Sequence, residues 1–378
     1  MENMNFISSG SFKSFNDGDS FFAFAKEREK RAEWRPIEAA KLQFEPLFEE
    51  PLLAPSVATK YGANTEAIEE CMDPEHSGLV AKIGNVFAPV GDSAIGTIRE
   101  RMAVRKMFWV RQHKNPAVLA KDVNSSFSMM PGKCIVKVAD EMVRAVLSER
   151  YTPINVPTVY TLVMDFLNEK YPEAVFVRGF YTHSYTEMLF DLSAYSDELL
   201  GSNKKVKANQ ATPVLYIQTS DVAVSSVSIR PLLLFNGTEA PLSYREDTRH
   251  LGKEELISER VQRSLELVVA KFSDVVEEVE KLDEIKLSNP YNALLRSFRA
   301  IKWPADAKKH ALESAENFKA MTEGQKVTAY DAYMAIVDAF SFYMRDNPTA
   351  DTSRFMDSVS RSVVIDWSRC DLPGTFSY

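Results

Sequence analysis

The sequence contains few of the residues from which disulfide networks and metal centres are built. It has 3 cysteines and 5 histidines among 378 residues. The cysteines Cys71, Cys134 and Cys370 lie far apart, form no CxxC pair and have no neighbouring pair of histidines. Neither a zinc site nor a disulfide framework is therefore predicted, and we expect no metal and no other cofactor. A reducing compartment is the expectation.

The sequence also lacks the long apolar segments and the motifs that would identify a class of protein directly. No apolar run approaches the roughly 20 residues of a membrane helix, so no membrane partner is expected. We find no P-loop, no Gly-x-Gly-x-x-Gly, no Gly-x-Ser-x-Gly and no His-Glu-x-x-His pattern. A hydrolase would have to combine distant single residues, such as Cys134 with His183 or His250. An enzyme is therefore the less favoured class.

Charge is present in ordinary amount but unevenly placed. The chain has 45 Lys+Arg against 53 Asp+Glu, a net charge of −8. The most basic stretch runs from Ile95 to Ser125, and Phe108 and Trp109 lie within it. Cations next to flat rings are typical of a groove for single-stranded nucleic acid, where they contact phosphates and stack on bases. The alternative is a solvated amphipathic helix whose rings face the core.

The first 55 residues predict an extended arm, because Ser, Asn, Asp and Gly alternate with phenylalanines without a sustained period. Such an arm docks through its aromatic side chains either on a neighbouring subunit or partner, or across its own domain. Within it, a short helix from about Phe21 to Trp34 is expected to end before Pro36. Residues 56–150 form the next predicted unit, a mixed basic segment.

Residues 151–290 carry the clearest strand signals and predict the core. A helix is expected over 156–170. Strands are expected over 174–182, 184–193, 214–219 and 225–235, with hairpins at Thr182–Ser184 and Asn236–Gly237. Residues 202–207 are predicted to be a basic loop.

A long helix from about Lys253 to Lys286 follows the strands. It has a heptad-like apolar seam, which packs either within the chain or on another subunit. Helices predominate in the remaining region, 291–378. We therefore predict an α+β fold: an antiparallel sheet of three to five strands packed by a long helix, with a helical C-terminal region and an extended N-terminal arm.

One polar constellation stands near the predicted strand ends. Thr219-Ser220-Asp221 closes one strand, Arg230 lies in the next, and Tyr244 to His250 precede the long helix. Hydroxyls and arginines near a helix N-terminus are typical of phosphate binding. A network of turn and helix-capping hydrogen bonds is the alternative.

Three segments resemble a known family. The run Met142 to Asn155, with Ser148-Glu149-Arg150-Tyr151, resembles the Leu-Ser-Asp-Arg-Tyr run of domain-of-unknown-function family 932, a family of phage- and plasmid-borne proteins. Tyr216–Asp221 and Arg249–Lys253 are similar to two later family motifs, although the glycine of the family's turn is missing after Asp221. The resemblance covers about residues 138–292. It implies a mobile-element protein in a bacterial cytoplasm and supplies no biochemical activity.

These observations lead to a functional hypothesis. A curved antiparallel sheet followed by a long helix is similar to the plan of phage single-strand annealing proteins, which form rings. We predict a non-catalytic phage or mobile-element protein that forms homo-oligomers and binds single-stranded nucleic acid during annealing or recombination. The residues expected to contact the nucleic acid are Arg101, Arg105, Lys106, Trp109, Arg111, Lys114, Lys204, Lys205, Lys207, Arg245 and Arg249. The alternative is a structural or host-factor-inhibiting protein that acts through protein contacts of the arm and the long helix.

Overall fold

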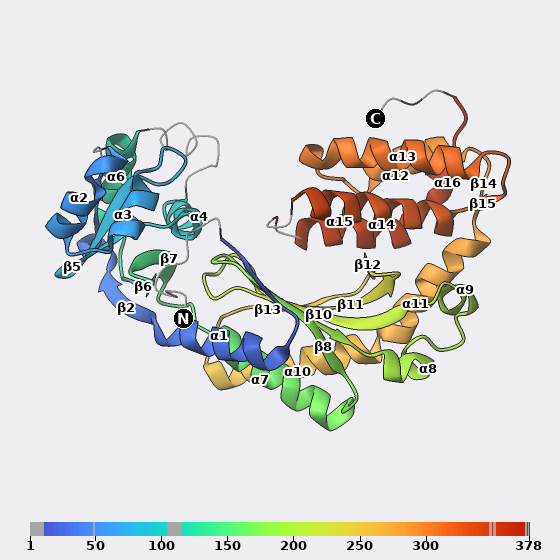
Figure 1. Cartoon of the computed structure of the whole chain (residues 1–378), viewed down its shortest axis with the longest axis horizontal. Helices are drawn as coiled ribbons and strands as arrows, with labels where there is room; N and C mark the ends of the chain where they lie inside the picture. Colours follow the sequence, from blue (N-terminus) through green and yellow to red (C-terminus); the bar gives the residue numbers. More distant parts are fainter. Residues whose placement is uncertain are drawn as a thin grey trace.

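The computed structural model describes residues 11–47, 50–103, 115–347, 350, 353–374, 376 and 378. These residues form an N-terminal lobe (residues 32–148), a large central sheet with its helices, and a helical lobe (residues 290–370) (Figure 1). The fold is mixed α and β with antiparallel sheets, as predicted. Among the described residues, no helix has the length and apolar character needed to cross a membrane.

The central sheet has seven strands in the order β1-β8-β9-β10-β11-β12, with β13 beside β11. Their bounds are β1 (Lys13–Phe15), β8 (Val175–Tyr181), β9 (Thr186–Asp191), β10 (Thr212–Thr219), β11 (Val227–Phe235), β12 (Thr238–Pro241) and β13 (Glu246–Thr248). The four predicted strands and both predicted hairpins are present. The sheet exceeds the predicted three to five strands because short strands extend its edges, and three or four residues carry too little periodicity to be recognised.

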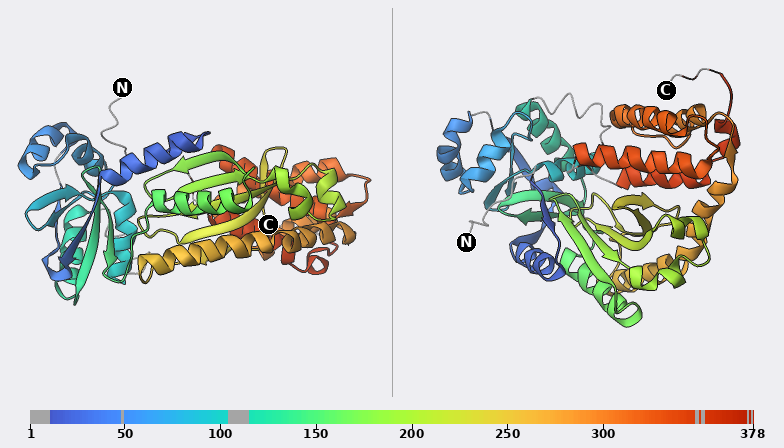
Figure 2. Two further views of the ribbon diagram at one scale, coloured as in Figure 1. Left: turned by 90° about the horizontal axis from the view of Figure 1, so that it is seen from below. Right: turned by 45° about the vertical axis from the view of Figure 1, so that its right-hand side comes forward.

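Helices cover both faces of this sheet (Figures 1 and 2). On one side lie α1 (Gly18–Lys30), α7 (Val156–Lys170) and α10 (Glu254–Ala270), and on the other lies the helical lobe. Gly179 of β8 faces α1, because a Cβ added at this residue would lie 2.4 Å from the Phe21 ring. Met188, Ile217 and Ile229 continue the same row across β9, β10 and β11, and all three are fully buried. The face toward α1, α7 and α10 is therefore the apolar one.

The predicted long helix consists of two helices, α10 and α11 (Phe272–Lys281), which meet at Lys271 and are followed by the 3-10 turn η4 (Leu282–Glu284). The eight apolar residues of its seam lie buried in the main core of this chain: Ile257, Val261, Leu265, Val268, Phe272, Val275, Val279 and Leu282. The described seam is thus covered from within the chain.

The described part of the first 55 residues does not form the extended arm that we predicted. Their described part contains β1, α1, β2 (Ala32–Glu38), the 3-10 turns η1 (Ala39–Lys41) and η2 (Pro51–Leu53), and β3 (Gln43–Pro46). Partners distant in sequence hold these strands, since β1 pairs with β8, β2 with β6 (Lys133–Ala139) and β3 with β4 (Leu79–Ile83). The segment was expected to dock either on a neighbouring subunit or partner, or across its own domain, and its described residues pack on their own chain.

The N-terminal lobe contains two three-stranded sheets, β2-β6-β7 and β3-β4-β5. Its further strands are β4 (Leu79–Ile83), β5 (Val86–Pro89), β6 (Lys133–Ala139) and β7 (Met142–Ser148). Its helices are α2 (Ala54–Tyr61), α3 (Thr65–Met72), α4 (Asp92–Arg101) and α6 (Pro116–Ser128). The described part of this lobe therefore combines helices with strands.

The helical lobe confirms the helices predicted after residue 290. It contains α12 (Pro290–Ala300), the 3-10 turn η5 (Ala305–Ala307), α13 (Lys308–Thr322), α14 (Ala329–Asp346), α15 (Ser353–Val364) and α16 (Trp367–Cys370). A two-stranded ladder of β14 (Lys286–Leu287) and β15 (Val327–Thr328) precedes α14, which begins with a capping box between Thr328 and Asp331.

One local prediction is wrong between β9 and β10. This connection contains η3 (Ser193–Tyr195), α8 (Ser196–Leu199) and α9 (Lys204–Ala208), so the residues predicted as a basic loop are mostly helical. The Glu280 carboxylate of α11 accepts hydrogen bonds from the backbone N–H groups of Lys205 and Val206, at 2.8 and 3.0 Å. A distant side chain thus supplies the cap of α9, which the local sequence does not reveal.

Candidate binding pocket on the polar face of the central sheet

The face of the sheet opposite α1 is unusually polar. Side chains alternate between faces along a strand, and residues paired across strands share a face. Two adjacent rows therefore point toward the helical lobe: Arg178, Leu189, Tyr216 and Arg230, and Phe180, Glu187, Gln218 and Ser228. Glu187, Gln218 and Arg230 are 4%, 1% and 2% exposed. Because buried polar groups are costly without partners, the partners of these side chains define the site.

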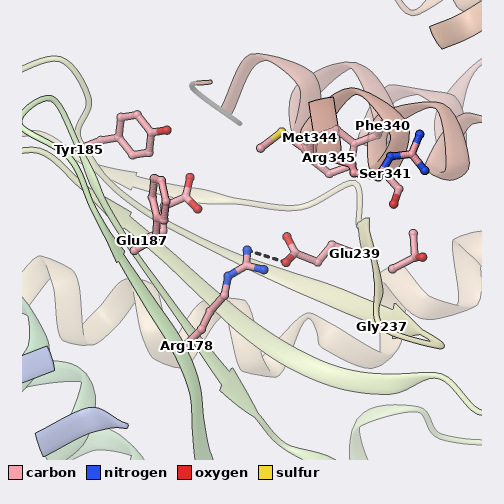
Figure 3. A pocket seen from close by; sticks show the side chains of 11 residues that line it. Arg178, Tyr185, Glu187, Gly237, Glu239, Phe340, Ser341, Met344 and Arg345 are labelled. Atoms are coloured by element: carbon pink, nitrogen blue, oxygen red, sulfur yellow. Dashed lines mark ion pairs between the residues drawn. The ribbon is translucent and has the colours of Figure 1, made fainter. Parts of the chain in front are cut away.

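An ion pair spans the concave side of the sheet. Arg178 Nη2 of β8 lies 2.6 Å from Glu239 Oε1 of β12, although three strands separate β8 from β12 in the sheet order. Neighbouring strands are about 4.8 Å apart, so two side chains can bridge this gap only if the sheet curls toward the helical lobe. Figure 3 shows the pair reaching across this curled surface.

A second set of charges joins the same face to α15. Arg230 Nη2 lies 3.1 Å from Asp357 Oδ1, and Arg245 also pairs with Asp357 and with Asp247. The Nε of Arg230 has no hydrogen-bond partner within the described residues. The helical lobe is therefore attached to the polar face partly through charged groups.

Between the curled sheet and α14 lies a pocket of about 360 Å³. It is lined by Arg178, Phe180, Tyr185, Glu187, Gly237, Thr238, Glu239, Phe340, Ser341, Met344 and Arg345. In Figure 3, Tyr185 and Glu187 lie on one side, Glu239 on the other, and the side chains of α14 above them. The volume falls within the roughly 300–1,000 Å³ of pockets that hold small molecules.

The aromatic wall of the pocket is held in place by its neighbours. The Phe180 ring is stacked on Phe12, with centroids 5.3 Å apart, and lies 6.2 Å from the Tyr185 ring. The Tyr185 hydroxyl donates a hydrogen bond to the carbonyl of Ala350 at 2.7 Å, which connects the β8–β9 hairpin to the segment between α14 and α15. A flat ligand would find a fixed stacking surface here.

The charges that line the pocket balance, with two arginines, Arg178 and Arg345, and two carboxylates, Glu187 and Glu239. Burial lowers the pKa of Arg178, but the carboxylates of Glu239 and Glu187 outweigh this effect and raise its pKa above the usual value. Arg178 therefore remains charged. A pocket without net charge favours a neutral ligand that offers both donors and acceptors over a bare polyanion.

The side chains that line the pocket define what it can offer a ligand. Its described lining residues include no histidine, cysteine or lysine, and their ionisable groups are two arginines, two glutamates and one tyrosine. Within the described part of the chain, no three His, Cys, Asp or Glu side chains cluster closely enough to hold a metal ion. What the pocket offers is stacking, a guanidinium donor and carboxylate acceptors.

The residues predicted to contact nucleic acid do not come together in one groove. Arg101 ends α4 and packs inside the N-terminal lobe, with Nη2 2.9 Å from Met130 Sδ. Lys204, Lys205 and Lys207 lie on α9, at the opposite end of the molecule from α4 (Figure 1). Arg105, Lys106, Trp109, Arg111 and Lys114 lie outside the described residues.

Several of these cations already have acidic partners. Lys205 pairs with Asp283 and Lys207 with Asp197, each at 3.0 Å. Arg245 belongs to the Asp357 cluster described above, and Arg249 is exposed on the short segment before α10. Because an acidic partner neutralises a cation locally, the predicted set on α9 and near β13 forms no positive surface by itself.

The polar constellation around residue 220 is largely a turn network. Ser220 Oγ donates a hydrogen bond to the carbonyl of Ser184 at 2.6 Å and accepts the backbone N–H groups of Val222 and Val224. Asp221 forms an ion pair with Lys137 of β6. These contacts match the alternative of a hydrogen-bonded turn, because the hydroxyl and backbone N–H groups that could have bound a phosphate already have partners in the turn.

The three segments that carry the family resemblance meet at the junction between the N-terminal lobe and the central sheet. The Tyr151 hydroxyl lies 2.9 Å from His250 Nδ1, and the two rings stack with centroids 5.2 Å apart. The Tyr151 hydroxyl also lies 3.4 Å from the carbonyl of Ser220. Burial lowers the pKa of His250 to about 4, against a smaller opposing effect of Asp221.

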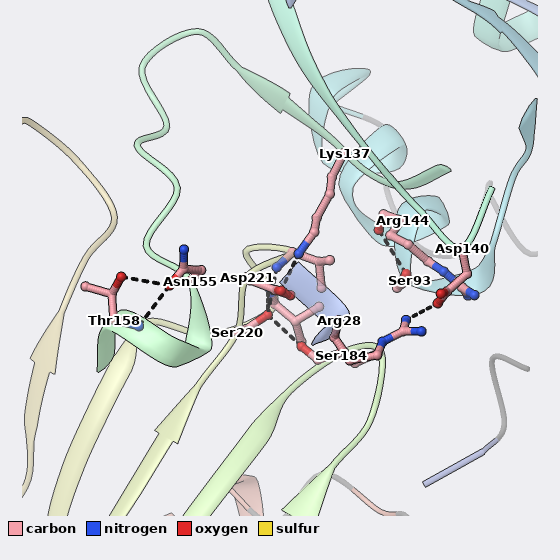
Figure 4. A network of polar contacts seen from close by, with 12 residues as sticks. Arg28, Ser93, Lys137, Asp140, Arg144, Asn155, Thr158, Ser184, Ser220 and Asp221 are labelled. Carbon is pink, nitrogen blue, oxygen red and sulfur yellow. Dashed lines mark hydrogen bonds and ion pairs between the residues drawn. The ribbon is translucent and has the colours of Figure 1, made fainter. Parts of the chain in front are cut away.

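This junction contains a buried charge network (Figure 4). Arg28 of α1 pairs with Asp140, with side chains 8% and 0% exposed, and Lys137 pairs with Asp221 and lies over the Trp34 ring. The cavity beside these residues measures about 20 Å³, enough for one water molecule. Arg28 lines this cavity and its Nε and Nη1 have no partner within the described residues, so a water there would satisfy polar atoms.

Comparisons with family models, with curated proteins and with solved structures found no match. The pocket therefore has to be interpreted from its own chemistry. Sequence reasoning missed every residue that lines it. The sequence did contain one signal for this site: Arg178 and Glu187 are charged residues within segments that are otherwise typical of half-buried strands.

Proposed function

We propose that this protein binds single-stranded nucleic acid and takes one unstacked base into the pocket between the central sheet and α14. The observation that carries this proposal is the pocket itself: a 360 Å³ space with an aromatic wall, two arginines and two carboxylates. Proteins that recognise single strands commonly stack splayed-out bases on aromatic rings and bind their edges by hydrogen bonds. The chemistry of the lining residues fits this mode.

The balanced charge of the pocket supports a base rather than a phosphate as its occupant. A nucleobase is neutral and carries donors and acceptors on its edges, whereas a phosphate next to Glu187 and Glu239 would be repelled. Phosphate contacts are instead proposed for the basic stretch of residues 95–125, mainly Arg105, Lys106, Arg111 and Lys114, with Trp109 as a further stacking residue. Oligomerisation, a phage or mobile-element origin and a cytoplasmic location remain predictions.

The test is the binding of fluorescently labelled oligonucleotides, measured by anisotropy over a salt series. We expect affinity to fall as salt rises, and the Arg105→Glu/Lys106→Glu variant to bind more weakly with a shallower salt slope. Phe180→Ala removes the stacking surface, worth about 1–3 kcal/mol per base, or roughly 5- to 150-fold in Kd. Phe166→Ala on α7, which lies on the other side of the sheet, is the matched control and should bind normally.

Two results would overturn the proposal. The first is an absence of binding to any single strand at low salt. The second is binding that neither Phe180→Ala nor the double charge reversal changes. Free nucleoside monophosphates form a second arm: if they bind as tightly as oligonucleotides of the same base, the natural ligand is a free nucleotide and the polymer is dispensable.

The alternative of an arm that docks on a partner protein receives no support from the described residues. The described strands of the predicted arm, β1, β2 and β3, pair with strands of their own chain. We therefore put forward a single function.

A further inference from the structure

The arrangement of charged side chains in the pocket indicates which base the pocket binds. Resting on the proposed function, we infer that the pocket selects guanine, with Glu187 and Arg178 reading the edges of the base and Phe180 stacking on its ring. The relative positions of these three side chains on the sheet support the assignment.

Phe180 and Glu187 form a directly paired position of β8 and β9. Paired residues have Cβ atoms about 4.5–5.5 Å apart on the same face, so a base stacked on Phe180 places one edge next to the Glu187 carboxylate. Arg178 lies two residues before Phe180 on the same strand and therefore on the same face. A base on this platform has a carboxylate acceptor near one edge and a guanidinium donor near another.

Glu239 acts as a positioning residue in this arrangement. Its carboxylate pairs with Arg178 Nη2 at 2.6 Å and directs the guanidinium across the concave face, as Figure 3 shows. One of the five N–H donors of the arginine is enough for this contact, so others remain for a ligand. Glu187 is 4% exposed and lies on the pocket wall, so any base bond that it accepts is well shielded from water.

Guanine matches this set of groups better than the other bases. It carries two neighbouring donors, N1–H and the N2 amino group, that one carboxylate can accept together. Its O6 and N7 are acceptors that an arginine contacts in a bidentate manner. Adenine and cytosine each offer a single amino group, and thymine and uracil a single N–H between two carbonyl oxygens that a carboxylate repels.

The experiment compares a labelled strand of twelve thymidines with the same strand carrying one central guanosine. We expect the guanosine strand to bind about tenfold more tightly, the lower part of the range for a bidentate base contact. Two base analogues then test single contacts without altering the protein. Inosine lacks the N2 amino group and should lose most of the preference, and 7-deazaguanosine lacks N7 and should lose part of it.

Glu187→Gln tests the protein side with almost unchanged shape. It should abolish the preference for guanosine, so that the ratio of the affinities for the guanosine and all-thymidine strands falls to about one. Glu259→Gln, on the exposed surface of α10, is the matched control and should retain the preference.

The outcomes separate this inference from the proposed function. If no strand binds, both fail. If the all-thymidine strand binds and guanosine adds nothing, base insertion stands and the guanine assignment is overturned. A preference that survives Glu187→Gln, or that inosine retains in full, also overturns the assignment.

Discussion

Two regions of this molecule contain buried charged side chains, and they differ in the space that surrounds the charges. At the junction between the N-terminal lobe and the central sheet lie the ion pairs Arg28–Asp140 and Lys137–Asp221, and Arg28, Lys137 and Asp221 line a cavity of about 20 Å³. On the polar face of the sheet, Arg178–Glu239 lies beneath a pocket of about 360 Å³. The ion pairs are chemically alike, so the room beside them distinguishes the two regions.

Because of this difference, we assign different roles to the charges of the two regions. At the junction each charged group is paired with one of opposite sign, and the pairs connect α1 and the turn after β10 with β6 and the turn that follows it, so we assign them to holding the lobes together. In the pocket the Arg178 side chain is 40% exposed, and the groups around it can exchange water for a ligand. Of the two regions, the pocket is therefore the one that leaves space beside its ion pair for a ligand.

The largest expected effect is at the junction. Asp140→Asn removes the only carboxylate paired with Arg28 in the described structure and leaves a guanidinium that is 8% exposed without a counter-charge. Asp140 has a φ of 49°, which Asn also adopts readily, so the substitution should not strain the backbone. We expect a loss of about 3–5 kcal/mol in the free energy of unfolding, measured by urea denaturation. A loss below 1 kcal/mol would show that this pair does not hold the lobes together.

A smaller effect concerns His250, which the junction keeps neutral. Because its folded pKa of about 4 lies below the unfolded value of 6.5, the unfolded chain takes up a proton first as pH falls, and stability declines from about pH 6.5 toward pH 4. Between pH 7 and pH 5, wild type should lose about 2 kcal/mol more than His250→Gln. Equal losses in the two proteins, measured by denaturation at both pH values, would contradict this origin of acid sensitivity.

The smallest expected effect is in the pocket. Glu239→Gln makes the same kind of change as Asp140→Asn, a carboxylate to an amide in an ion pair. Here the partner Arg178 is partly exposed, so we expect a loss of no more than about 1 kcal/mol in the free energy of unfolding. The same urea titration measures both variants. If Glu239→Gln proved as damaging as Asp140→Asn, the distinction between a sealed junction and an open pocket would fail.

Much of the fold was predictable because its signals are local. Period-2 runs identified β8 to β11, the Asn236–Gly237 pair identified the hairpin between β11 and β12, and helical periodicity identified α7 and the helices after residue 290. The N-terminal segment was misread because β1 and β2 take their partners from β8 and β6. Those distant partners satisfy the backbone hydrogen bonds of both strands, and the local sequence does not reveal them.

The candidate site was not predictable in the same way. Basic residues in sequence suggested a groove, but Lys205 and Lys207 have acidic partners from other elements. Arg178 and Glu239 are far apart in the chain, on strands that do not pair with each other. No local pattern signals that they meet.

The sequence by itself determined the class of fold, most of the helices and strands and the uneven distribution of charge, because propensity and periodicity act over a few residues. Only the tertiary structure decided which charges are neutralised and where space remains. Curling of the sheet brings β8 toward β12, and α14 covers the concave side without filling it. Strand order, curvature and helix packing create that pocket, and these depend on contacts between residues distant in the sequence.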